Sequence, residues 1–173
     1  NRKSMINQLT ERFFKNTLYV RLSSDWIAVK HIETGKVFED KPVLALRSDH
    51  KGKRVVAAIG AEAEHLTSDS GITIHNGFHH PRVCISEFDI AEATLRYFFK
   101  NAIGKNTFIR PVGILHPIDN FEGGLSQMEY RALTELAIAS GARRTFIWVG
   151  RELKDIELAT LTFPESEGIL KTR

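Results

Sequence analysis

Histidines and one cysteine form the densest group of metal-binding residue types in the sequence. His75, His79 and His80 lie close together, with His65 and Cys84 nearby. Imidazole and thiolate groups are the usual ligands of zinc. Two adjacent histidines point in different directions unless the loop bends, however, and the spacing matches no established zinc pattern. We therefore expect an exposed loop here, with no metal site, and a buried Cys84 that serves as a small apolar group.

A short polar turn is the next candidate for chemistry. Ser23, Ser24 and Asp25 bring hydroxyl and carboxylate groups together, but no histidine is identifiable as a base for either serine. Arg21 precedes this turn and could attract a bare phosphate. No P-loop of the Gly-x4-Gly-Lys-Ser/Thr type occurs, and the double glycine at 123–124 lies in a loop. These residues predict no catalytic centre and no cofactor.

Composition indicates an ordinary globular protein. The chain has 173 residues, of which 42% are hydrophobic and 26% are charged. A single cysteine excludes an intrachain disulfide, and no apolar run approaches the roughly 18 residues that a membrane span needs. The net charge is +3 and the basic residues are scattered, so no nucleic-acid partner is expected. We expect one cytoplasmic domain.

The first half of the chain is rich in predicted strands and turns. A helical stretch is expected at 61–66 and a loop at 67–81. Alternating or β-rich segments predict strands at 18–22, 26–32, 43–46 and 54–59.

The second half alternates helices with strands. Ser86, as an N-cap with Asp89 after it, predicts a helix that Gly104 ends, and Ser126 with Glu129 forms a capping box for a helix that Gly141 ends. Strands at 108–116 and 145–149, a helix at 152–161 and a tail at 164–173 complete the pattern. The order β-β-β-α-β-α-β-α predicts an α/β domain over 16–163, with a mixed sheet whose late strands are parallel.

Residues 1–15 form a separate amphipathic segment. Ile6, Leu9, Phe13 and Phe14 share one helical face, whereas the other face is mostly polar. Two interpretations stay open for this apolar face. It contacts a membrane surface weakly, or it packs against the domain or a partner chain.

Four stretches resemble the MreB family of actin-like rod-shape proteins. They are Asp40-Lys-Pro-Val-Leu-Ala-Leu46, Ala57-Ala-Ile-Gly-Ala-Glu-Ala63, the helix that begins Ile85-Ser-Glu-Phe-Asp, and the passage through Gly141-Ala-Arg143 to Phe146-Ile147. The resemblance covers about residues 18–162 and implies a single actin-like, ribonuclease H-like half-domain. Most of these residues are core positions, turn glycines and caps, so they indicate a fold rather than an activity.

The resemblance also implies which nucleotide-binding residues have changed. The family's first phosphate turn reads Asp-Leu-Gly-Thr, and the matching residues here are Arg21-Leu22-Ser23-Ser24. The family's pair of glutamates after the last strand corresponds to about Val149-Gly150-Arg151, with Glu152 one or two positions out of register. No second phosphate turn follows residue 150. A degenerate phosphate turn is therefore expected at Arg21, Ser23 and Ser24, with no catalytic residue and no metal.

These features predict a non-catalytic MreB-like protein that acts through protein contacts. Its partner would be a second copy or an actin-like filament, and its role that of an adaptor, scaffold or filament regulator in the cytoplasm or at the inner face of the membrane. Two alternatives stay open. One is a nucleotide-binding ATPase half that a partner chain completes, and the other is a nucleic-acid or phosphate-binding module.

Overall fold

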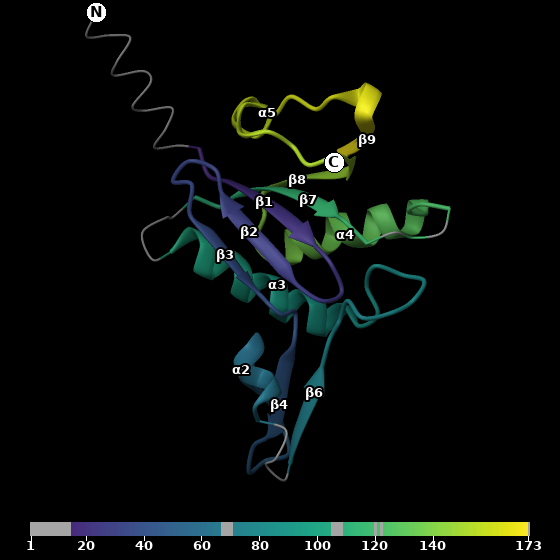
Figure 1. The fold of residues 1–173 in the computed structure, drawn as a ribbon. Helices are drawn as coiled ribbons and strands as arrows, with labels where there is room; N and C mark the ends of the chain where they lie inside the picture. The colour runs from purple at the N-terminus through teal and green to yellow at the C-terminus, as the bar shows by residue number, and fades with distance from the viewer. Residues whose placement is uncertain (1–14, 67–70, 105–108, 120, 122, 173) are drawn as a thin grey trace, which may run out of the picture.

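A six-stranded mixed sheet forms the body of the protein (Figure 1). The computed structural model describes residues 15–66, 71–104, 109–119, 121 and 123–172. Three interior strands of the six-stranded sheet are parallel, and antiparallel strands complete the sheet on both sides. In spatial order the strands are β3 (Val37–Asp40), β2 (Ile27–His31), β1 (Thr17–Leu22), β7 (Val112–Pro117), β8 (Arg144–Gly150) and β9 (Gly168–Thr172).

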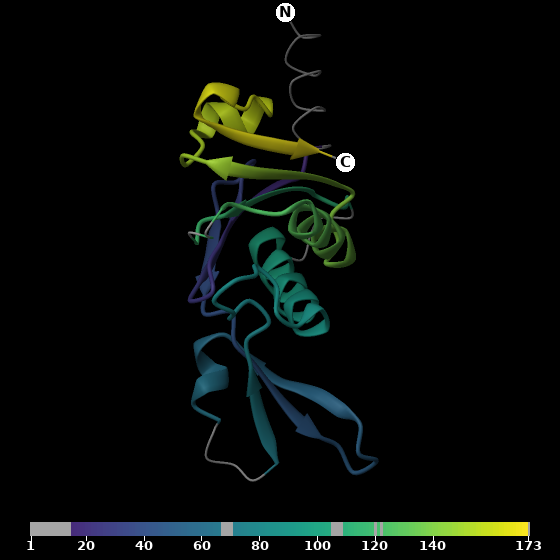
Figure 2. The same ribbon diagram turned by 90° about the vertical axis from the view of Figure 1, so that its right-hand side faces the viewer.

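A smaller antiparallel sheet stands away from the larger one, as Figure 2 shows. Its strands, in spatial order, are β5 (Arg54–Ile59), β4 (Leu44–Ser48) and β6 (Ile72–His75). The short helix α2 (Ala61–Glu64) covers one face through Ala63, which is completely buried. The other face packs through Leu44 and Leu46 on Ile90.

Two helices, α3 (Phe88–Ile103) and α4 (Gln127–Ala139), cover one face of the larger sheet. Successive side chains of a strand point to opposite faces, so Leu18, Val20 and Leu22 of β1 all point toward these helices. Their partners on α3 are buried side chains at helical spacing: Ala91, Leu95, Phe98, Phe99 and Ala102.

The opposite face is covered by residues 151–167, which we call the cap. The cap contains α5 (Asp155–Thr160) and a 3-10 turn η1 (Glu165–Glu167), and β9 follows it. Leu153 and Leu158 of the cap pack with Trp148, which is completely buried.

The structure confirms the main elements that the sequence predicts. The strands β1, β7 and β8 run parallel, and β1 and β2 form an antiparallel hairpin. The side chain of Ser126 accepts the Glu129 N–H while the Glu129 side chain accepts the Ser126 N–H, as a capping box requires. Gly104 and Gly141 follow their helices with positive φ, a conformation that favours glycine.

Several elements differ from expectation. The N-cap of α3 is Glu87, because the Ser86 hydroxyl donates instead to the carbonyl of Asn76. The sequence does not predict the strands β3 and β6, and the predicted strands at 43–46 and 54–59 join β6 in a second sheet. The sequence predicts a tail at 164–173, but 168–172 form β9 because they pair with β8 and partly bury Leu170 against Trp148.

The amphipathic segment with Ile6, Leu9, Phe13 and Phe14 lies outside the described residues. Within the described ranges, no helix has both the length and the apolar character to cross a membrane.

Candidate functional site

The carboxyl ends of the parallel strands β1, β7 and β8 lie side by side at one end of the larger sheet. Leu22 at the end of β1 is paired in register with Pro117 at the end of β7, and β8 ends beside them at Gly150. In open α/β sheets, ligands bind just beyond the carboxyl ends of the strands. Residues 23–26, 118–119 and 151–154 follow these strands and form the candidate site.

Arg21 is engaged by an acidic residue and an aromatic ring. Its Nη1 lies 3.0 Å from Oε1 of Glu152, and its guanidinium lies 5.0 Å from the centroid of the Trp26 ring. The Arg21 and Glu152 side chains are 34% and 62% exposed, so water screens this ion pair and its contribution to stability is small. The contact instead neutralises the charge that Arg21 brings to the strand end.

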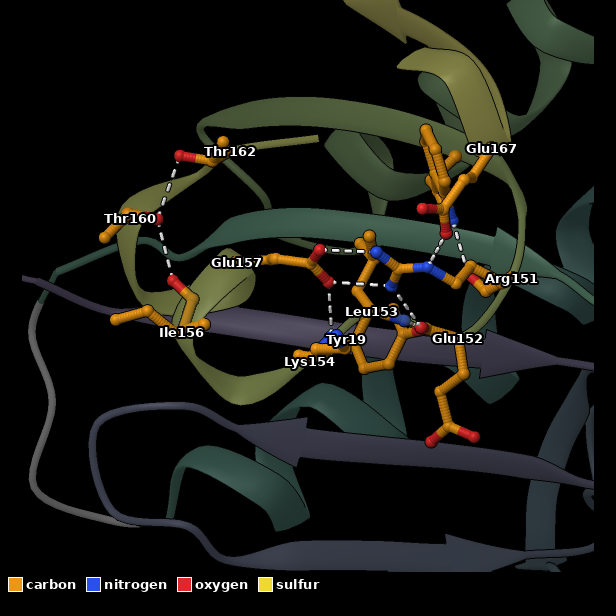
Figure 3. A network of polar contacts seen from close by, with 11 residues as sticks. Tyr19, Arg151, Glu152, Leu153, Lys154, Ile156, Glu157, Thr160, Thr162 and Glu167 are labelled. Atoms are coloured by element: carbon orange, nitrogen blue, oxygen red, sulfur yellow. Dashed lines mark hydrogen bonds and ion pairs between the residues drawn. The ribbon is translucent and has the colours of Figure 1, made fainter. Parts of the chain in front are cut away.

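Arg151 is the centre of a larger ion-pair network (Figure 3). Its Nη1 and Nη2 donate to the two carboxylate oxygens of Glu157 at 2.9 and 2.6 Å, and its Nε donates to Glu167. The hydrogen bonds from Arg151 lower the pKa of Glu157 to about 2. Arg151 therefore ties α5 and η1, both in the cap, to the end of β8.

The turn after β1 is closed by contacts from two other loops. The Ser24 N–H donates to Oδ2 of Asp119 at 2.7 Å, and the side-chain amide of Asn76 donates to the Ser24 carbonyl at 2.8 Å. The Ser23 N–H is used within the hairpin, where it donates to the carbonyl of Trp26 at 3.0 Å. Backbone N–H groups in such a turn are the donors that a phosphate cradle would need. A carboxylate of the chain itself occupies one of them.

The space beneath this turn is filled by side chains. Phe78, Cys84 and Phe121 pack under Ser23 and Ser24 and leave no room there for even one water molecule. Burial raises the pKa of the Cys84 thiol to about 12. The thiol is therefore a packing group, as expected.

A buried histidine connects the three parallel strands. Nε2 of His116 lies 2.9 Å from the carbonyl oxygen of Gly150, which can only accept, so Nε2 carries the proton. The Tyr19 hydroxyl then donates to His116 Nδ1 at 2.6 Å and accepts the Leu153 N–H at 3.3 Å. Burial lowers the pKa of His116 and raises that of Tyr19 to about 12. Both groups are thus neutral near pH 7 and join β1, β7, β8 and the cap.

The histidines considered for zinc do not converge. His79 and His80 are exposed, and the His75 ring contacts the Thr73 hydroxyl at 3.1 Å. In the part of the chain that the structure describes, no three His, Cys, Asp or Glu side chains are placed to hold a metal ion.

Arg21, Ser23 and Ser24, the residues of the predicted phosphate turn, lie at the end of β1 and in the turn after it. The structure adds residues that the sequence did not indicate. Asp119, Tyr19 and His116 carried no signal, since each contact joins residues more than 90 positions apart. Glu152 was noted only as an acid out of register, although its contact with Arg21 balances the charge there.

Comparison with known proteins relates the chain to MreB. No family model matches the chain. The chain is 30% identical over 138 residues to the cell shape-determining protein MreB of Haemophilus influenzae, and 29% identical to that of Escherichia coli. Each match covers 78% of this chain but 38% of the relative.

Solved structures agree on the fold. MreB 5 of Spiroplasma citri bound to AMPPNP superposes with a TM-score of 0.61 at 16% identity, covering 77% of this chain and 38% of that chain. A non-polymerising mutant of MamK bound to AMPPNP superposes with a TM-score of 0.60 at 19% identity, covering 78% of this chain and 40% of that chain. The chain is therefore MreB-like in sequence and actin-like in fold over the matched stretch, and it spans about two fifths of the length of these relatives.

Proposed function

We propose that the chain is a non-catalytic MreB-like protein that acts through protein contacts, as an adaptor, scaffold or filament regulator in the determination of cell shape. Its relatives carry the name of cell shape-determining proteins. One of the superposed structures is a MamK mutant described as non-polymerising. Polymerisation is therefore a property to test for this chain. We place this activity in the cytoplasm, at a filament of MreB or a second copy of the chain.

The charge at the strand ends is the observation that carries this proposal. The resemblance implies acidic residues near the positions of Arg21 and Arg151. Both arginines are instead engaged by carboxylates of the same chain. An arginine has no lone pair to offer magnesium at either position. The Asp119 carboxylate at the Ser24 N–H repels a phosphate. Nucleotide binding would have to break these contacts first.

The catalytic part of the proposal is tested by steady-state ATP hydrolysis. We expect no phosphate release above that of buffer from the purified protein with ATP and magnesium. Protein-dependent turnover that tracks the chain through purification, and that Arg21→Ala alters, would overturn it.

The protein-contact part is tested by co-sedimentation with filaments of Escherichia coli MreB, with analytical ultracentrifugation of the chain alone. We expect the chain to pellet with the filaments or to self-associate. A monomer that stays in the supernatant at every filament concentration would contradict this part of the proposal.

A further inference from the structure

The outer edge of β9 is open. This strand is the last of the larger sheet, and no described residue pairs with its outer side. An unpaired edge presents a row of backbone N–H and C=O groups that can accept another strand. Ile169 on this strand is 54% exposed.

A groove follows α4 and reaches β9 at Lys171 and Thr172. Side chains of a strand alternate, so Ile169 and Lys171 share a face, and Lys171 Nζ lies 5.9 Å from the ring centroid of Tyr130 on α4. Two neighbouring hollows follow the helix here. One is lined by Tyr130, Arg131 and Lys171, and the other by Ile138 and Arg143.

The groove carries an excess of positive charge. Arg131 is paired with Glu135, whereas neither Lys171 nor Arg143 has an ion-pair partner among the described residues. Edge-to-edge pairing of two copies through β9 would bring both Lys171 side chains and both basic grooves to one seam. Like charges at a seam disfavour that pairing, whereas a partner of opposite charge is favoured.

We propose that the β9 edge binds an extended acidic segment of a partner protein as a seventh strand of the sheet. Main-chain hydrogen bonds along the edge would supply affinity, and alternate side chains would supply specificity. An apolar side chain of the added strand would pack beside Ile169, and an acidic one would lie beside Lys171. The inference rests on the proposed function in that it assigns a surface to a protein contact.

The test begins with selection from a random dodecapeptide library displayed on phage, with the purified chain as bait. We expect the selected peptides to alternate apolar and acidic residues. Their affinity, measured by fluorescence polarisation of a labelled peptide, should fall about tenfold or more in Lys171→Glu. The matched control is Lys51→Glu, an equal charge change at an exposed turn of the smaller sheet. It should leave the affinity unchanged.

Hydrogen exchange on the unmodified protein gives a second readout. Bound peptide should slow exchange at the amides of β9 and leave those of β3, at the other edge of the sheet, unaffected. The inference is overturned if selection yields no acidic preference, if the two lysine variants behave alike, or if protection falls outside β9. These outcomes leave the ATP and filament experiments untouched, so failure here is distinguishable from failure of the proposed function.

Discussion

At the scale of single residues, the candidate site is neutralised from within the chain. Arg21 meets Glu152, Arg151 meets Glu157 and Glu167, and the Ser24 N–H meets Asp119. Arg21, Arg151 and the Ser24 N–H, which could contact a nucleotide, thus already have partners within the chain. The sequence shows the arginines and serines of this site directly, because their positions follow from the resemblance.

His116 makes the stability of the protein sensitive to acid. Burial lowers the pKa of His116 below its ordinary value of 6.5, so the native state binds fewer protons than the unfolded state just below that pH. The free energy of unfolding should therefore fall as the pH drops from 6.5, by at most about 1.4 kcal/mol per pH unit for one histidine. His31, whose pKa burial also lowers, adds in the same direction.

Urea unfolding at several pH values between 7.5 and 5 measures this dependence. His116→Gln should be less stable at pH 7.5 and should show a shallower pH dependence than the wild type. The matched control, His79→Gln, changes an exposed ring and should keep the wild-type slope. Equal slopes in all three proteins would argue against a buried neutral His116.

Cys84 should be unreactive in the native protein. Its thiol is buried, and a pKa of about 12 leaves almost no thiolate at pH 8. Ellman's reagent at that pH should label the native protein far more slowly than the protein in urea. Rapid native labelling would mean that the packing beneath the Ser23–Ser24 turn opens readily.

At the scale of elements, the segment that follows β8 supplies the last strand of the larger sheet. After β8 the chain turns back through α5 and η1 and returns as β9. Arg151 fixes this path by ion pairs, and Trp148 fixes it by packing. Trp148 also donates its Nε1–H to the carbonyl of Arg151 at 2.7 Å.

Gly168 is required by the close approach of β9 to Trp148. A Cβ at this position would lie 2.5 Å from the Trp148 ring and 2.7 Å from the carbonyl oxygen of Val149. Gly168→Ala should therefore lower the free energy of unfolding by about 1–3 kcal/mol, because the overpacked strand must shift. Chemical denaturation measures this change. Ile169→Ala, at an exposed position of the same strand, should change stability by about 0.5 kcal/mol or less.

The elements that the sequence predicts are those with a strong internal pattern. Residues 18–22 alternate, and the helices carry caps and glycine stops that depend only on neighbouring residues. By contrast, β3, β6 and β9 are short strands whose existence depends on pairing with distant segments. The contact between Tyr19 and His116 could not be predicted for the same reason, since 97 positions separate the two residues.

At the scale of the whole molecule, one actin-like body carries two sheets and a cap that closes the second face of the larger sheet (Figure 2). The edge where a nucleotide would contact this body is occupied by the chain's own carboxylates and aromatic side chains. Among the described residues, the edge strands β3 and β9 and the groove along α4 are open surfaces.

Isothermal titration calorimetry of magnesium-ATP into the purified chain tests most directly whether the internal contacts of the candidate site exclude nucleotide. We predict no saturable heat up to about 1 mM nucleotide, because Arg21, Arg151 and Asp119 keep their internal partners. A control titration of Asp119→Ala shows whether removing one internal carboxylate changes that result. Saturable binding to the wild type with a dissociation constant in the micromolar range would contradict the closed site.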